Sequence, residues 1–126
     1  MQRRTQQREA IKKALGEAGR PLSPHEILEE ARAHSPGMGI ATVYRAVKQL
    51  VDADWLAPVE IPGEPPRYEV VRQDHHHHFY CRECGRVFAV QHCPGDFRRM
   101  TPRGFRLESH EVLLRGVCAE CRKSTP

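Results

Sequence analysis

Two pairs of cysteines with the spacing C-x-x-C carry the clearest chemical signal in this sequence. Cys81 and Cys84 form the first pair, and Cys118 and Cys121 form the second. Each pair places two thiolates on one tight turn, and two such turns supply the four ligands of a tetrahedral zinc ion. Four thiolates leave no open coordination position, so the pairs predict a structural zinc site. A redox pair is the alternative, but such a pair opens a helix, whereas Cys84 precedes a glycine and a β-rich run.

Four consecutive histidines, at positions 75–78, lie directly before the first cysteine pair. Side chains alternate along an extended segment, so His75 and His77 are expected on one face. His76 and His78 are then expected on the opposite face, and each pair supplies two ligands of a different metal site. A solvated loop is the alternative for an isolated run of histidines, but the adjacent cysteine pair favours metal binding.

Each histidine pair needs further ligands. The candidates are one histidine and four carboxylates: His110, Glu69, Asp74, Asp96 and Glu108. Mixed imidazole and carboxylate ligation suits Zn²⁺, Fe²⁺, Mn²⁺, Co²⁺ or Ni²⁺, and it releases metal more readily than four thiolates do. The sequence therefore predicts a division between one structural zinc site and one or two exchangeable sensing sites.

The first half of the chain is expected to form three helices and a β-hairpin. Apolar residues recur at helical spacing from Ile11 to Ala18, before a glycine. Ser23 is a favourable N-cap for a second helix, with proline next and Glu26 three residues on. The third helix is expected from Ile40 to Ala53. The β-rich runs 55–61 and 67–71 follow it, so residues 1–72 are assigned to a winged helix-turn-helix domain.

The third helix is the candidate recognition element. Val43, Val47 and Leu50 fall on one buried stripe, whereas Arg45 and Gln49 lie on the opposite arc. A solvated helix face is the alternative interpretation of that polar arc.

The second half has a different character. Short β-rich runs at residues 79–81, 86–90 and 111–117 are separated by glycine and proline, with a brief helix expected between 94 and 103. Residues 73–126 are assigned to a small α/β domain, so the fold class is α+β with two domains.

Composition narrows the functional classes. The chain has 126 residues and a formal charge of +4, but basic and acidic residues balance over positions 1–66. Nucleic-acid binding by the first half must therefore depend on where its charges point. No apolar run reaches the ~18–20 residues of a membrane helix, and the N-terminus lacks the apolar stretch of a signal peptide. We expect a cytoplasmic protein whose reduced cysteines bind metal.

These motifs together resemble the ferric uptake regulator family. The resemblance covers nearly the whole chain and rests on the following segments: Thr5-x-Gln7-Arg8-x-x-Ile11; Gly39-Ile40-Ala41-Thr42-Val43-Tyr44-Arg45; Tyr68-Glu69; His75-His76-His77-His78-Phe79-x-Cys81-x-x-Cys84-Gly85-x-Val87; Gly104-Phe105-x-Leu107-x-x-His110; and the terminal cysteine pair. The four-histidine form is closer to the zinc-sensing branch.

The resemblance implies a homodimeric regulator, usually a repressor, that binds palindromic operator DNA when loaded with a divalent metal. It implies a structural Zn²⁺ and a regulatory Zn²⁺, or Fe²⁺ or Mn²⁺. It assigns DNA contacts to Thr42, Tyr44 and Arg45 of the recognition helix. Gln49 on the same helix and Arg8 of the first helix are also expected to contact DNA. It assigns Glu69, His76 and His78 to a sensor site at the hinge between the domains. It assigns a second site to His75, His77, Asp96 and His110.

The hinge site departs from the family pattern. Pro21 stands where a histidine ligand is common, and Ala89 replaces a carboxylate on the strand after the first cysteine pair. His25, His92 or Cys93 is then needed to complete that site.

Three other functions remain open from the sequence. A metalloenzyme is one, because two histidines and a carboxylate also build catalytic zinc sites, although no His-Glu-x-x-His motif is present. A zinc-ribbon interaction module is another. A peroxide sensor that oxidises a metal ligand is the third.

Overall fold

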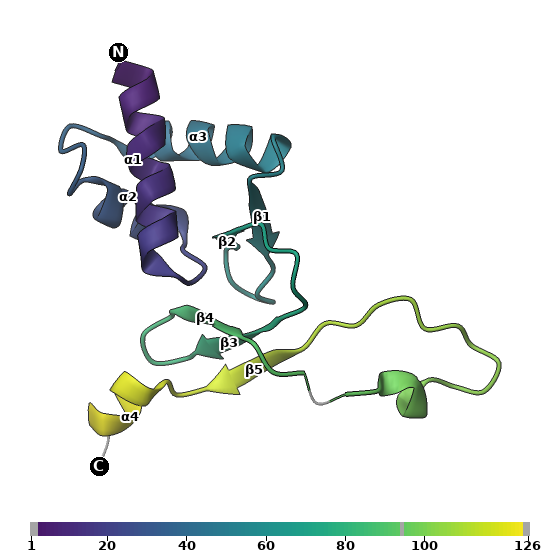
Figure 1. The fold of residues 1–126 in the computed structure, drawn as a ribbon. Helices are drawn as coiled ribbons and strands as arrows, with labels where there is room; N and C mark the ends of the chain where they lie inside the picture. Colours follow the sequence, from purple (N-terminus) through teal and green to yellow (C-terminus); the bar gives the residue numbers. More distant parts are fainter. Residues whose placement is uncertain (1–2, 94, 125–126) are drawn as a thin grey trace. The chain divides into compact units, whose positions relative to one another are not determined.

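The computed structural model describes residues 3–93 and 95–124 (Figure 1). The chain separates into two compact units, residues 1–73 and 74–126, so the division falls one residue after the boundary expected at 72.

The first unit begins with three helices. They are α1 (Arg3–Ala18), α2 (Pro24–Ala31) and α3 (Ile40–Asp52). A capping box starts α2: the Ser23 hydroxyl accepts from the Glu26 N–H at 3.2 Å, and the Glu26 carboxylate accepts from the Ser23 N–H at 3.0 Å. This helix ends at Ala31, with Arg32 as its C-cap.

A two-stranded wing completes this unit. Strands β1 (Leu56–Val59) and β2 (Arg67–Val70) pair antiparallel. The wing is tied to the segment before α2, because Leu22 and Tyr68 exchange backbone hydrogen bonds of 2.9 and 2.8 Å. Three helices followed by this hairpin form a winged helix-turn-helix.

The core of the unit is one apolar cluster shared by the helices and β1. It contains Ile11 from α1, Ile27 from α2, Val43 from α3 and Leu56 from β1, each at most 2% exposed. The buried stripe of α3 leaves its polar residues facing away from the core.

The second unit is built on a three-stranded sheet in the order β4-β3-β5 (Figure 1). Strand β3 (His77–Cys81) lies in the centre. It pairs antiparallel with β4 (Val87–Val90) and parallel with β5 (Leu113–Gly116). The parallel pairing brings together segments that are more than thirty residues apart in sequence, such as His78 and Leu113.

Two short helical segments flank this sheet. The 3₁₀ helix η1 (Phe97–Met100) corresponds to the brief helix expected between 94 and 103. Helix α4 (Ala119–Ser124) was not predicted, and it begins inside the second cysteine pair. Among the described residues, no helix is long and apolar enough to cross a membrane.

Candidate metal centres and nucleic-acid interface

The four paired cysteines come together at one end of the sheet. The sulfur atoms of Cys81, Cys84, Cys118 and Cys121 all lie within 4.8 Å of one another, with Cys84 and Cys118 Sγ 3.9 Å apart. Zinc–sulfur bonds of ~2.3 Å imply tetrahedral edges of about 3.8 Å, so this donor set fits Zn²⁺. Because no position is open to substrate, the cluster suits a structural ion.

The first cysteine turn has a backbone reason for its shape. The Gly85 N–H donates to the Cys81 carbonyl at 2.8 Å, and Gly85 has φ of 75°, which a residue with a Cβ rarely adopts. The second pair lies differently, because Cys118 accepts the Arg122 N–H and so starts α4. Helix position therefore does not separate this pair from a redox pair; the convergence of four sulfur atoms does.

The pKa values of these clustered thiols are shifted in opposite directions. Burial acts to raise the pKa of Cys81, but backbone N–H groups of Cys84, Cys118 and Glu83 lower it to about 6. The pKa of Cys121 rises to about 12, mainly through its side-chain hydrogen bond with Cys118 and then through burial. Without a metal ion, crowding keeps protons on part of the cluster, and a bound divalent ion replaces them.

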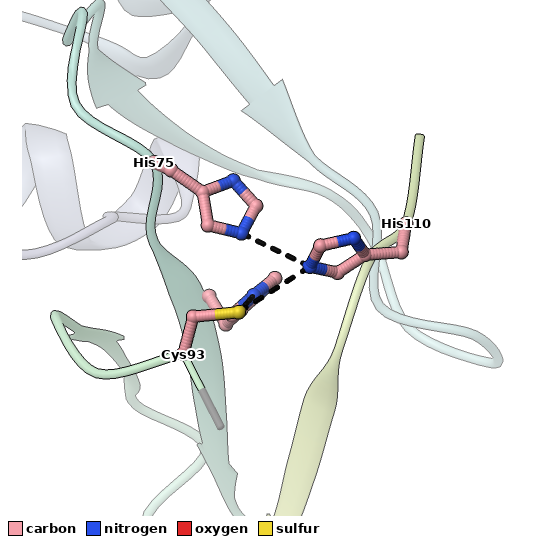
Figure 2. A group of neighbouring side chains, drawn as sticks. His75, Cys93 and His110 are labelled. Atoms are coloured by element: carbon pink, nitrogen blue, oxygen red, sulfur yellow. Dashed lines mark hydrogen bonds between the residues drawn. The ribbon is translucent and has the colours of Figure 1, made fainter. Parts of the chain in front are cut away.

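A second cluster combines three imidazoles with one thiol. His75, His77, Cys93 and His110 place ligand atoms within 4.8 Å of one another. His75 Nε2 lies 3.1 Å from His110 Nε2, and Cys93 Sγ lies 3.4 Å from Nε2 of both His77 and His110. Figure 2 shows His75 and Cys93 directed toward the ring of His110.

Separate elements position these donors. His77 is the first residue of β3 and is 3% exposed, and the Val112 N–H before β5 donates to its Nδ1 at 3.3 Å. Burial, followed by the nearby His75 and His110, lowers the pKa of His77, so its ring is neutral at neutral pH. A neutral imidazole is the form that binds metal. The ring of Phe97 in η1 packs against the ring of His110, with centroids 4.3 Å apart and the planes tilted by 42°.

Asp96, which the sequence interpretation assigned to this cluster, lies elsewhere. Its carboxylate accepts from the Arg98 backbone N–H at 2.9 Å and from the Arg98 guanidinium at 2.9 and 3.1 Å. Asp96 is thus the N-cap of η1 and is absent from the donor clusters of the described residues. The hydrogen bonds from Arg98 lower the pKa of Asp96.

The other histidine pair lies apart from this cluster. The rings of His76 and His78 are 5.0 Å apart. In the sheet register His78 lies opposite Ala89, so the strand offers no carboxylate there. Glu69 lies in β2 of the first unit, whereas the two histidines belong to the second, so the hinge set remains a prediction.

The structure also shows where the residues considered as replacement ligands for the hinge site lie. Pro21, at the position where a histidine ligand was expected, is fully buried. His25 and His92 are exposed and join no donor cluster in the described ranges. Cys93 belongs to the cluster with His77 and His110 instead.

The polar arc of α3 borders a hollow of about 120 Å³. Its lining includes four of the five residues expected to contact DNA, together with other residues of α1 and α3: Arg4, Gln7, Arg8, Thr42, Arg45, Ala46 and Gln49. The Arg8 guanidinium donates to Gln49 Oε1 at 2.8 Å, which joins the first helix to α3. Arg45 donates to Thr42 Oγ1 at 3.3 Å.

Tyr44 lies on a different side of the helix. At ~100° per residue it points about 160° away from Thr42, and it is not part of the hollow. Its side chain is 53% exposed. The five residues therefore form one group of four and a separate aromatic side chain.

Comparison with known proteins decides the family. A family model described as the ferric uptake regulator family matches residues 2–115. The chain belongs to the ferric uptake regulator family.

Individual relatives support the same family assignment. The ferric uptake regulation protein of Campylobacter jejuni is 30% identical over 123 residues, covering 93% of this chain and 78% of that protein. A zinc-bound manganese uptake regulator superposes with a TM-score of 0.78 at 30% identity, covering 93% of this chain and 91% of the other. The Helicobacter pylori ferric uptake regulator, described as having three functional metal-binding sites, superposes with a TM-score of 0.72 at 28% identity, covering 92% and 79%.

Members of this family are transcription regulators and not enzymes. This chain is accordingly a metal-responsive, DNA-binding regulator, and the metalloenzyme interpretation is excluded by the family.

Sequence reasoning missed Cys93 as a member of the second cluster. The available signal was arithmetic: five cysteines are present, and the two pairs account for four. The remaining cysteine lies nine residues after Cys84, on the connection that also carries Asp96.

Proposed function

We propose that this regulator is a homodimeric, zinc-responsive repressor that binds palindromic operator DNA. The observation that carries the proposal is the presence of two donor clusters in the small second unit. One cluster has four thiols, and the other has three imidazoles and one thiol. The first suits a permanent ion and the second an exchangeable one.

The α3 hollow supports the DNA-binding part of the proposal. It is lined by three arginines and two glutamines, and guanidinium and amide groups are the ones that bind base edges and phosphates.

The proposed switch is a shift in population between arrangements of the two units. Glu69 lies four residues before the unit boundary at Gln73, and His76 and His78 lie within five residues after it. A metal ion bound by these three residues would restrict the hinge. In a dimer, the hinge sets the spacing of two recognition helices, which must match half-sites about 34 Å apart. The metal selects the spacing that binds.

Fluorescence anisotropy with labelled operator DNA tests the proposal. The protein, with its cysteine site filled, is titrated with Zn²⁺, Mn²⁺ and Fe²⁺ at fixed salt, and its mass is followed by light scattering. We expect a dimer whose operator affinity rises with Zn²⁺ at the lowest free concentration. Equal affinity with and without metal would refute a metal-dependent repressor. A response only to Mn²⁺ or Fe²⁺ would keep the repressor and replace zinc, and loss of binding on peroxide treatment would indicate a peroxide sensor.

A further inference from the structure

The second cluster contains a donor of a different chemical class from the carboxylate that the sequence suggested. Three imidazole nitrogens and one sulfur converge, with contacts of 3.1 Å between nitrogens and 3.4 Å between nitrogen and sulfur. A tetrahedral ion with zinc-like bond lengths has ligand-to-ligand edges of about 3.3–3.6 Å for these atoms. The four donors already approach that geometry.

We propose that Cys93 is the fourth ligand of a three-histidine, one-thiolate site, and that its sulfur makes this site selective for Zn²⁺ and Co²⁺ against Mn²⁺. The other three ligands are His75, His77 and His110. Figure 2 shows His75 and His110 beside Cys93. The inference deepens the proposed function, because it names the class of ion that the second site accepts.

The selectivity follows from the donor types. Thiolate is a soft ligand that favours zinc, whereas carboxylate oxygen is the ligand that suits Mn²⁺. Imidazole is compatible with zinc, iron and nickel, so three histidines alone discriminate weakly. The fourth ligand therefore decides whether the site prefers Zn²⁺ or Mn²⁺.

The local structure leaves the carboxylate unavailable. Asp96 is held by two hydrogen bonds to the Arg98 guanidinium and by one to the Arg98 backbone, and these bonds cap η1. Recruiting Asp96 to the cluster would break all three. Cys93 is half-buried and already lies 3.4 Å from two of the imidazoles.

Cobalt spectroscopy tests whether the sulfur binds metal. The full chain, reduced and carrying Zn²⁺ in the cysteine site, is titrated with Co²⁺ in the absence of DNA. We expect one further Co²⁺ with a sulfur-to-cobalt charge-transfer band in the near ultraviolet and the intense visible bands of tetrahedral cobalt. Cys93→Asp should retain Co²⁺ but lose the charge-transfer band.

Competition against a fluorescent chelator tests the selectivity. The ratio of Zn²⁺ affinity to Mn²⁺ affinity should fall at least ~10-fold in Cys93→Asp, an effect at the lower end of what a change around a metal ligand produces. Asp96→Asn and His92→Ala are the controls, because neither residue is in the cluster, and both should match the parent in ratio and spectrum. Zinc content and far-ultraviolet circular dichroism establish that each variant is folded.

Two results would overturn the inference. One is a charge-transfer band that persists in Cys93→Asp; the other is a loss of the band or of selectivity in Asp96→Asn. Since these measurements contain no DNA, their failure would leave the repressor proposal standing. A repressor that fails to bind operator would equally leave the site assignment intact.

Discussion

Arg45 lies in the first half of α3 with its side chain exposed, and its guanidinium is 3.3 Å from the Thr42 hydroxyl. Arg45→Ala is expected to weaken operator binding by ~1–3 kcal/mol if this guanidinium reads a base edge. Folding should be unaffected, because the side chain lies away from the buried stripe. Anisotropy titrations at fixed salt measure the loss.

Lys13→Ala is the matched control for the charge removed. Lys13 is an exposed cation of α1 that lies 3.9 Å from Glu17 and is not part of the α3 hollow. It should change operator affinity far less than Arg45→Ala. Equal losses in the two variants would assign the effect to net charge and remove Arg45 from the reading set.

Some metal ligands could be predicted from the sequence and others could not. The four paired cysteines could be identified because their spacing defines a turn, and the structure brings the same four together. The count of five cysteines singled out Cys93 as unpaired, but its partner could not be predicted, because no spacing rule links it to His110, seventeen residues away. Asp96 was assigned through the family resemblance, and that assignment did not include the competing bond from Arg98 that holds it at η1.

The first turn of α2 shows how one element is defined locally. Ser23 and Glu26 exchange the two bonds of a capping box, and Arg20 binds the Glu26 carboxylate at 2.9 Å. Ser23→Ala is expected to lower the free energy of unfolding by about 1 kcal/mol, because one helix N–H loses its acceptor. Chemical denaturation of the full chain measures this change.

Ser23→Asp provides the comparison, since aspartate caps helices about as well as serine. It should keep most of the parent stability. A loss equal to that of Ser23→Ala would show that something other than the cap hydrogen bond is being measured.

The sheet of the second unit depends on its metal. Cys84→Ser is expected to lose the structural zinc and to unfold the β4-β3-β5 sheet at room temperature. Zinc binding contributes about 10–16 kcal/mol in small zinc domains, more than a unit of this size holds otherwise. Zinc content and thermal unfolding test this directly.

Cys93→Ser is the control for loss of a thiol, because Cys93 is not among the four clustered cysteines. It should retain the structural zinc and the sheet. A zinc-free Cys84→Ser protein with an unchanged melting temperature would contradict a structural role for the ion.

Elements were predictable to different degrees. The helices of the first unit followed from apolar periodicity and the cap at Ser23, and the wing followed from two β-rich runs. Helix α4 was missed because the second cysteine pair dominated the interpretation of this segment, although the glutamate, arginine and lysine within residues 119–124 are good helix formers. The parallel pairing of β3 with β5 was out of reach, since strand order depends on long-range contacts that no local pattern encodes.

At the scale of the whole molecule, the two histidine pairs are proposed to have different roles. His76 and His78 control metal-dependent DNA binding, whereas His75 and His77 build the second metal cluster. His76→Ala with His78→Ala is expected to abolish metal-dependent operator binding and to leave the structural zinc and the dimer intact. The reason is position: Glu69, the proposed third ligand, lies in the first unit, so only this pair is assigned to the hinge. Anisotropy, zinc analysis and light scattering report the three properties.

His75→Ala with His77→Ala is the reciprocal variant. It should lower stability or metal affinity at the second cluster while leaving a metal response in DNA binding. If the two double variants behave the other way round, the hinge set is vestigial, and the sensor is the cluster that contains Cys93 and His110.

The parallel pairing of β3 with β5 has a further consequence for how the two clusters influence each other. Each cluster joins the segment around β3 to the segment around β5: His75 and His77 to His110, and Cys81 and Cys84 to Cys118 and Cys121. Both therefore close nearly the same long loop of chain, and the entropy lost on closing it depends only weakly on its length. Binding of the first ion incurs this loss of loop entropy. The second ion then binds to segments that are already held together. Occupancy of the cysteine cluster should then tighten binding at the histidine cluster, and by thermodynamic reciprocity the second ion should strengthen retention of the first by the same factor.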